Sequence, residues 1–193
     1  TLSLHDALPI CYRYYEMKDQ AYDPGITIPP TLKDQYRATM GWCARAVDSL
    51  ADRLVFRDFS DDNFDLMGVF NMNNPDVLFD SAILSALISS CCFGYIAADE
   101  DGFPRIQIID GANATGIIDP ITGLLTEGYA VLERDDNKQP IIEAYLTAGE
   151  TQIYRSGERT PEIIKNPAPY PLLVPIINRP DALRPFGHSR ISR

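Results

Sequence analysis

The feature that most constrains the fold is a change of pattern near Cys92. Before this point, apolar residues recur at the three- and four-residue steps of helices. After it, short β-rich runs alternate with turns such as Asp119-Pro120-Ile121-Thr122-Gly123, which has proline early and glycine late. Helices followed by short antiparallel strands predict an α+β fold class.

The N-terminal half contains three candidate helices. The first covers residues 11–22 and stops at Asp23-Pro24-Gly25. The second begins at the N-cap Thr31 and carries apolar residues at helical spacing as far as Leu54, with a short strand expected at 54–56. The third begins at Asn74-Pro75-Asp76, where a cap, a proline and an acid stand in favourable order, and its apolar residues surround the helix.

The C-terminal half predicts a series of strands. The first two form a hairpin around the turn at 99–102. Short β-rich runs between turn residues predict strands at 93–98, 104–109, 116–118, 129–133, 141–146, 152–155 and 172–177.

The stretch from Ser81 to Ala98 has no charged residue and reaches the minimum length of a transmembrane helix. It contains four serines, however, and its second half has the composition of a strand. We therefore expect a buried helix that leads into a buried strand, and no membrane partner.

Charge and cysteine content narrow the functional classes. The chain carries 17 Lys and Arg against 27 Asp and Glu, a net charge of −10. This balance argues against a surface that grips phosphates, because such surfaces cluster Lys and Arg. The four cysteines (Cys11, Cys43, Cys91 and Cys92) show no CxxC spacing, which is typical of a reducing compartment.

The search for catalytic chemistry identifies no site. The histidines are His5 and His188, and Gly187-His188-Ser189 lacks the spacing of a triad. The sequence of residues 99–102 lacks the register of a calcium loop, and we interpret it as a solvated turn. We therefore predict no catalytic, cofactor-binding or metal-binding residue, no cofactor and no enzymatic activity.

The order of several motifs resembles a known family. The segment Gly41-Trp42-Cys43-Ala44-Arg45-Ala46-Val47-Asp48-Ser49-Leu50-Ala51-Asp52-Arg53-Leu54 is similar to a helix of the siphophage-type portal proteins of tailed bacteriophages. A buried helix leading into a strand follows at Phe79 to Tyr95, and Asp110 precedes Ile118-Asp119-Pro120-Ile121-Thr122-Gly123. The run from Leu173 to Pro180, followed by Gly187-His188-Ser189-Arg190-Ile191, is similar to the segment that approaches the first stem helix.

The resemblance implies a structural subunit of the portal ring, the head-tail connector at the capsid vertex of the virion that conducts DNA during packaging and ejection. Implied partners are other portal subunits in a ring of about twelve, the terminase large subunit, the major capsid or scaffolding protein, and a head-tail adaptor. Double-stranded DNA would pass through the channel without sequence-specific binding. Assembly is expected in the bacterial host cytoplasm.

The resemblance also implies roles for single residues. Trp42, Asp48, Asn178, Arg179 and Gly187 are expected to pack, to form turns and to hold the ring.

Two alternatives remain open. One is another phage structural or connector protein. The other is a carboxylate-dependent hydrolase using Asp58, Asp61 or Asp62, although these acids and Asp65 fit a solvated loop better.

The ends of the chain are interpreted separately. Residues 1–10 can be back-translated into a common sequencing-adapter oligonucleotide, so we expect them to be an artefact outside the fold. Residues 11–193 are expected to be the N-terminal wing region of a portal protein, cut before the stem and clip.

Overall fold

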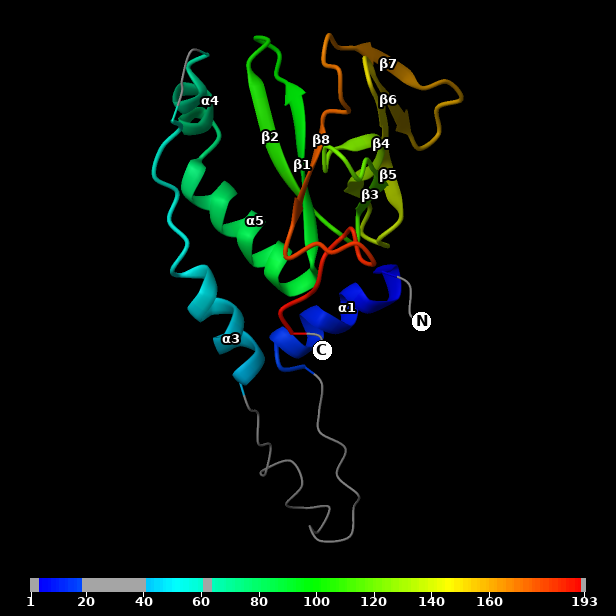
Figure 1. The fold of residues 1–193 in the computed structure, drawn as a ribbon. Coiled ribbons are helices and arrows are strands. Elements are labelled where there is room, and N and C mark those ends of the chain that lie inside the picture. The colour runs from blue at the N-terminus through cyan, green and yellow to red at the C-terminus, as the bar shows by residue number, and fades with distance from the viewer. Residues whose placement is uncertain (1–3, 19–40, 61–63, 192–193) are drawn as a thin grey trace, which may run out of the picture.

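The computed structural model describes residues 4–18, 41–60 and 64–191, and these combine helices with antiparallel sheets as predicted (Figure 1). The helices are α1 (Leu4–Tyr15), α3 (Trp42–Ala51), α4 (Leu66–Met72) and α5 (Pro75–Ser89). The strands are β1 (Cys91–Ala98), β2 (Pro104–Asp110), β3 (Ala114–Ile118), β4 (Leu125–Arg134), β5 (Pro140–Thr147), β6 (Glu150–Arg155), β7 (Glu162–Lys165) and β8 (Leu173–Ile177).

The strands form two antiparallel sheets. The first has the order β2-β1-β8 and the second the order β3-β4-β5-β6-β7. Helix α5 covers the side of the first sheet that faces away from the second sheet (Figure 1). Its Ala82 and Ala86 pack on the buried Cys92, with Ile108 and Ile176 beside them.

The main core lies between the two sheets. Phe93, Tyr95 and Leu173 of the first sheet pack against Leu125 and Leu146 of the second, and all five are at most 8% exposed. Successive side chains of a strand point to opposite faces. Strand β1 therefore sends Phe93 and Tyr95 toward the second sheet and Cys92 toward α5.

The edge strand β8 of the first sheet carries a proline at its centre. Pro175 of β8 stands opposite Phe93 of β1, and three positions further along the Ile96 amide donates to the carbonyl oxygen of Leu172 at 2.9 Å. Hydrogen-bonded and non-hydrogen-bonded residue pairs alternate along antiparallel strands, so the Phe93–Pro175 pair is a non-hydrogen-bonded one. The nitrogen of Pro175 therefore points away from β1, and its missing N–H removes no hydrogen bond from the sheet. The same proline weakens this edge as a template for a further strand.

The predicted unit from Ser81 to Ala98 is confirmed as a helix that passes directly into a strand. Helix α5 ends at Ser89 and β1 begins at Cys91, with Ser90 at a positive φ of 86° between them. The hydroxyl of Ser89 has the carbonyl oxygens of Ser85 and Cys91 as alternative acceptors for its one proton, which satisfies this buried polar group internally. The expectation that this helix is buried on most sides is wrong for the first half of α5, where Val77 is 61% exposed.

The described residues contain no helix with the length and apolar character required to cross a membrane.

Other sequence predictions need correction. Residues 54–56 form no strand, because they pair with no neighbour and leave Val55 75% exposed. Helix α4 and strand β7 were not predicted. The helix expected from Thr31 to Leu54 is described only from Trp42 and ends at Ala51, whereas residues 19–40 lie outside the described residues.

The helix expected at 11–22 is α1, which starts at Leu4 and ends at Tyr15. It therefore runs without a break across the boundary predicted between residues 10 and 11. The contribution of residues 1–10 to stability stays a prediction.

Candidate functional site

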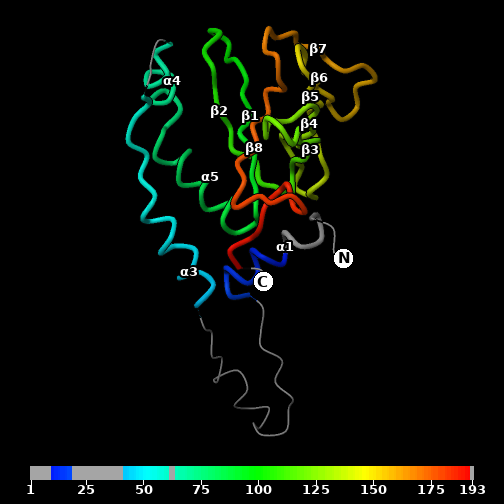
Figure 2. Tube along the Cα trace, viewed as in Figure 1, coloured from blue at the N-terminus to red at the C-terminus, as the bar shows by residue number. Residues whose placement is uncertain are grey.

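Two of the segments that carry the portal resemblance, helix α3 and the loop after β8, meet near the point where α5 passes into β1. The loop after β8, residues 178–191, crosses beneath the two sheets beside α1 (Figure 2). The amide of Asn178 donates to the carbonyl oxygen of Ser90, and the amide of Arg190 donates to that of Leu87, both at 2.8 Å. The last carbonyls of a helix have no partner within the helix, so this loop supplies the missing donors.

A small hydrophobic core formed by helices α1, α3 and α5 lies next to these hydrogen bonds. Val47 of α3 is fully buried and packs in one cluster with Cys11 of α1 and with Leu87 and Ile88 of α5. Ile191 from the end of the loop packs against the same cluster. Segments separated by more than a hundred positions in the sequence therefore share one core.

Asp48 of the predicted motif has a defined partner. The hydroxyl of Tyr15 donates to its Oδ1 at 2.8 Å, and this bond raises the pKa of Tyr15. The contact ties α1 to α3. The expected structural role of Asp48 is therefore visible in the fold.

Asn178 and Gly187 lie where the two ends of the loop come close together, a place we call the neck of the loop. The side-chain amide of Asn178 donates to the carbonyl oxygen of His188 at 2.6 Å, and the amide of His188 donates back to the Asn178 carbonyl at 2.9 Å. Gly187 has a φ of 76°, and a Cβ at this position would overlap the Asn178 carbonyl oxygen. Only glycine fits this close approach without strain. Arg179 also has a positive φ, of 52°, as expected of a turn residue.

His188 holds the tip of the loop. Its Nε2 lies 2.6 Å from Asp181 Oδ2, and its Nδ1 lies 3.2 Å from Arg184 Nη1. Because arginine can only donate, Nδ1 accepts in this arrangement and Nε2 carries the proton that Asp181 accepts. The hydrogen bond from His188 is the main cause of the lowered pKa of Asp181.

The neighbouring serine is also committed to the fold. The Oγ of Ser189 donates to the carbonyl oxygen of Ile88 at 2.6 Å, and the residue is buried. Neither ring nitrogen of His188 faces that hydroxyl as a base, since both are engaged by Asp181 and Arg184. A cavity of about 490 Å³ adjoins this loop. The arrangement orders a loop and does not activate a nucleophile.

Trp42 differs from expectation. It is the first residue of α3 and is 77% exposed, so it does not pack into the cores formed by the described residues. The structure therefore shows no packing role for Trp42 within the described part of the chain, and its role in holding the ring stays a prediction.

The acidic residues weighed as a hydrolase site do not converge in the part of the chain that the structure describes. Asp65 caps α4 by accepting from the amide of Gly68 at 3.3 Å, and Asp58 accepts from the amide of Phe59 at 2.8 Å. Asp61 and Asp62 lie outside the described residues. Across the described ranges, no group of three or more potential ligands gathers around a common metal position.

Two other acids organise turns. Asp99 accepts from the amide of Phe103 at 2.8 Å and pairs with Arg105, and these bonds lower its pKa. Asp119 accepts from the amide of Ile121 and the hydroxyl of Thr122, with the same effect on its pKa. Both turns were predicted from the sequence, and the carboxylates hold them.

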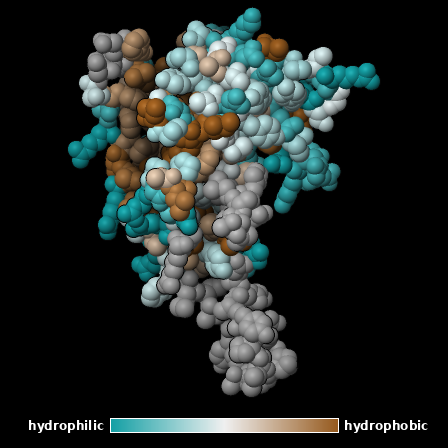
Figure 3. All heavy atoms as spheres, turned by 45° about the vertical axis from the view of Figure 1, so that its right-hand side comes forward, coloured by the Kyte–Doolittle hydropathy of each residue, from teal (hydrophilic) through white to brown (hydrophobic). Residues whose placement is uncertain are grey.

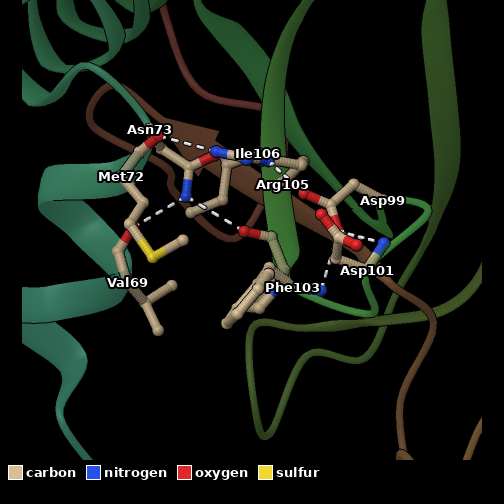
Figure 4. A network of polar contacts seen from close by, with 9 residues as sticks. Val69, Met72, Asn73, Asp99, Asp101, Phe103, Arg105 and Ile106 are labelled. Atoms are coloured by element: carbon tan, nitrogen blue, oxygen red, sulfur yellow. Dashed lines mark hydrogen bonds and ion pairs between the residues drawn. The ribbon is translucent and has the colours of Figure 1, made fainter.

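Asn73 is an important residue that sequence reasoning missed (Figure 4). Its Oδ1 accepts from the amide of Ile106 at 2.8 Å, and its Nδ2 donates to the carbonyl oxygens of Pro104 and Val69. The side-chain amide thus imitates a strand along the open edge of β2 and ties α4 to the sheet. No local pattern reveals the contact with β2, because Pro104 and Ile106 lie about thirty positions away.

The cysteines are free, and three of them are buried. Burial raises the pKa of Cys91 to about 11 and that of Cys92 to about 12. Thiols with such pKa values are poor nucleophiles and poor metal ligands near neutral pH.

A scan of protein-family models and a search of curated proteins found no match to this chain.

Proposed function

We propose that this chain is part of the wing region of a bacteriophage portal subunit and acts as a structural component of the ring that conducts DNA. The observation that carries the proposal is the meeting of the portal-like segments at the end of α5. Val47 of the α3 motif packs in one cluster with Leu87 and Ile88 of α5. From the C-terminal motif, the amides of Asn178 and Arg190 donate to the carbonyl oxygens of Ser90 and Leu87 at the same helix end. A set of motifs that shares one structural junction is more informative than each motif alone.

The charge of the chain supports the same proposal. A conduit must let phosphates slide past, and a net charge of −10 disfavours tight binding to them. The hydrolase alternative has weaker support, because Asp58 and Asp65 are engaged by nearby backbone amides. In this proposal an ATP-driven terminase supplies the work, and the portal contributes shape and subunit contacts.

The gene that encodes this chain provides the first test. We expect it to continue for several hundred residues, to encode long helices after Arg193, and to lie beside a terminase gene. A downstream segment that supplies histidines and carboxylates in metal-ligand spacing would replace the portal proposal with the hydrolase alternative.

A further inference from the structure

A cavity of about 540 Å³ opens between α3, α4 and α5. Its floor is aromatic: the ring centroid of Phe56 lies 4.5 Å from that of Phe70 and 6.0 Å from that of Phe79. Hydrophobic side chains gather in this part of the molecule, at the upper left of Figure 3. A pocket of this size and character suits the apolar side chains of a partner.

The rim of this pocket is acidic. Asp48 and Asp52 line it from the side of α3, and Asp76 and Asp80 line it from the first turns of α5. No Lys, Arg or His lines the pocket within the described part of the chain. The carboxylates of Asp52, Asp76 and Asp80 have no ion-pair partner among the described residues. The pocket therefore complements an apolar group flanked by positive charge.

The loop from 179 to 190 has the opposite character. Leu183 at its tip is 85% exposed. Three exposed arginines (Arg179, Arg184 and Arg190) and one aspartate give this segment a charge of +3 − 1 = +2, in a chain whose net charge is −10.

The loop presents Leu183 in an ordered conformation. Oδ1 of Asp181 accepts from the amides of Leu183 and Arg184 at 2.8 Å and 2.7 Å. His188 holds the other carboxylate oxygen of Asp181. A group that is already ordered loses less conformational entropy when it binds.

We propose that the Leu183 loop of one copy inserts into the α3–α4–α5 pocket of a second copy. Leu183 would contact the aromatic floor, and the arginines would face the acidic rim. The loop is fixed to the end of α5 at Leu87, whereas Asp76 and Asp80 lie on its first turns. With Leu183 exposed in this way, the loop does not fill the pocket of its own chain.

The occupant is a second copy because one chain carries both complementary surfaces. A pocket-to-pocket contact would place four carboxylates against four others, which like-charge repulsion opposes. A loop-to-pocket contact joins two different patches, so each copy retains a free loop and a free pocket for further neighbours. Such heterologous contacts close into rings or continue as filaments. The inference rests on the proposed portal function and assigns a lateral contact to it.

Sedimentation velocity on the 193-residue protein over a concentration series tests the contact. The pocket variant carries Asp76→Arg and Asp80→Arg, and the loop variant carries Leu183→Asp. All three positions are exposed, so the fold should tolerate the changes. Each variant alone should self-associate at least about tenfold more weakly than the wild type, the effect of losing one anchor or reversing two rim charges.

Mixing the two variants is the decisive step. One intact pocket and one intact loop remain in the mixture, so the variants should form a one-to-one pair with nearly wild-type affinity and should assemble no further. Asp136→Arg and Ile121→Asp are matched controls at exposed positions in other turns, and they should leave self-association unchanged. Raising the salt concentration should weaken the wild-type contact because exposed charges are screened.

Several results would overturn the inference. These are a wild type with no concentration dependence up to about 1 mM, variants that associate as the wild type does, and a mixture that fails to pair. Pairing of the pocket only with a basic peptide from another protein would also overturn it. In the completed protein, rings that survive the pocket variant would refute the contact but not the portal proposal. A working loop-to-pocket pair in a protein that forms no ring would refute the portal proposal alone.

Discussion

Replacing Gly187 with alanine should destabilise the protein more than a glycine-to-alanine change in an open turn does. Gly187 has a φ of 76°, which costs an L-residue about 1–2 kcal/mol. A Cβ there would also lie 2.7 Å from Cγ2 of Ile177 and overlap the carbonyl oxygen of Asn178. Relieving this overlap moves the neck of the loop and weakens the His188–Asn178 hydrogen bond, which adds about 1–3 kcal/mol.

The expected total loss is therefore about 2–5 kcal/mol, or roughly 4–20 °C in Tm for a chain of this size. The matched control is Gly123→Ala. Gly123 has a nearly equal φ of 72° and no atom within 4 Å of the added Cβ, so this variant should lose only the backbone cost. Urea denaturation followed by circular dichroism measures both free energies of unfolding. Equal losses for the two variants would refute the claim that the neck requires glycine for its close approach.

Three further predictions concern other parts of the chain. Asn73→Leu should destabilise the protein by about 1–3 kcal/mol, because it leaves polar groups on the edge of β2 unpaired. Hydrogen exchange at the Ile106 amide should also become faster. The control Asn137→Leu, in an exposed turn, should change neither the stability nor this exchange rate. Deletion of residues 1–10 should leave Tm unchanged, since Ile10 is 37% exposed and, among the α1 side chains that the structure describes, those in the helical cluster lie from Cys11 onward. A drop in Tm of several degrees would contradict the interpretation of residues 1–10 as lying outside the fold. The folded-state pKa of Asp99 is lowered below its ordinary value of 3.8, so the ionised carboxylate stabilises the fold above that pH, and this stabilisation is lost as the pH falls through the folded pKa. Asp99→Asn should therefore reduce Tm near neutral pH. A difference in Tm between variant and wild type that stays the same at the lowest pH would contradict this.

Local signals in the sequence predicted most of the C-terminal half. The turn at 119–123 contains its own hydrogen-bonding acid and a glycine at positive φ, so it marks a strand boundary without help from distant residues. The start of α5 was equally clear from Asn74 and Pro75, although Asn74 adopts a left-handed conformation and makes no side-chain cap.

The secondary-structure predictions failed where contacts with residues distant in the sequence decide whether a segment forms a strand. Val55 has high strand propensity, but propensity yields no strand without a neighbour to pair with. Strand β7 carries Ile163 and Ile164 on an exposed edge, and it exists because β6 offers hydrogen bonds to it.

The candidate site was predicted only in part. The sequence pointed to Asn178 and Gly187 as turn residues, and the structure confirms both. It could not reveal that Asn178 and Arg190 cap the end of α5, since about ninety to a hundred positions separate each residue from its partner. The exposure of Trp42 was also beyond reach, because tryptophan in a helix usually predicts burial.

Electron microscopy of the completed gene product tests the central claim most directly. The full-length protein should form closed rings with a central channel wide enough for duplex DNA, while the 193-residue chain should self-associate only weakly in light scattering. Full-length particles that stay monomeric at high concentration, or that form two-fold dimers without a channel, would contradict the portal proposal.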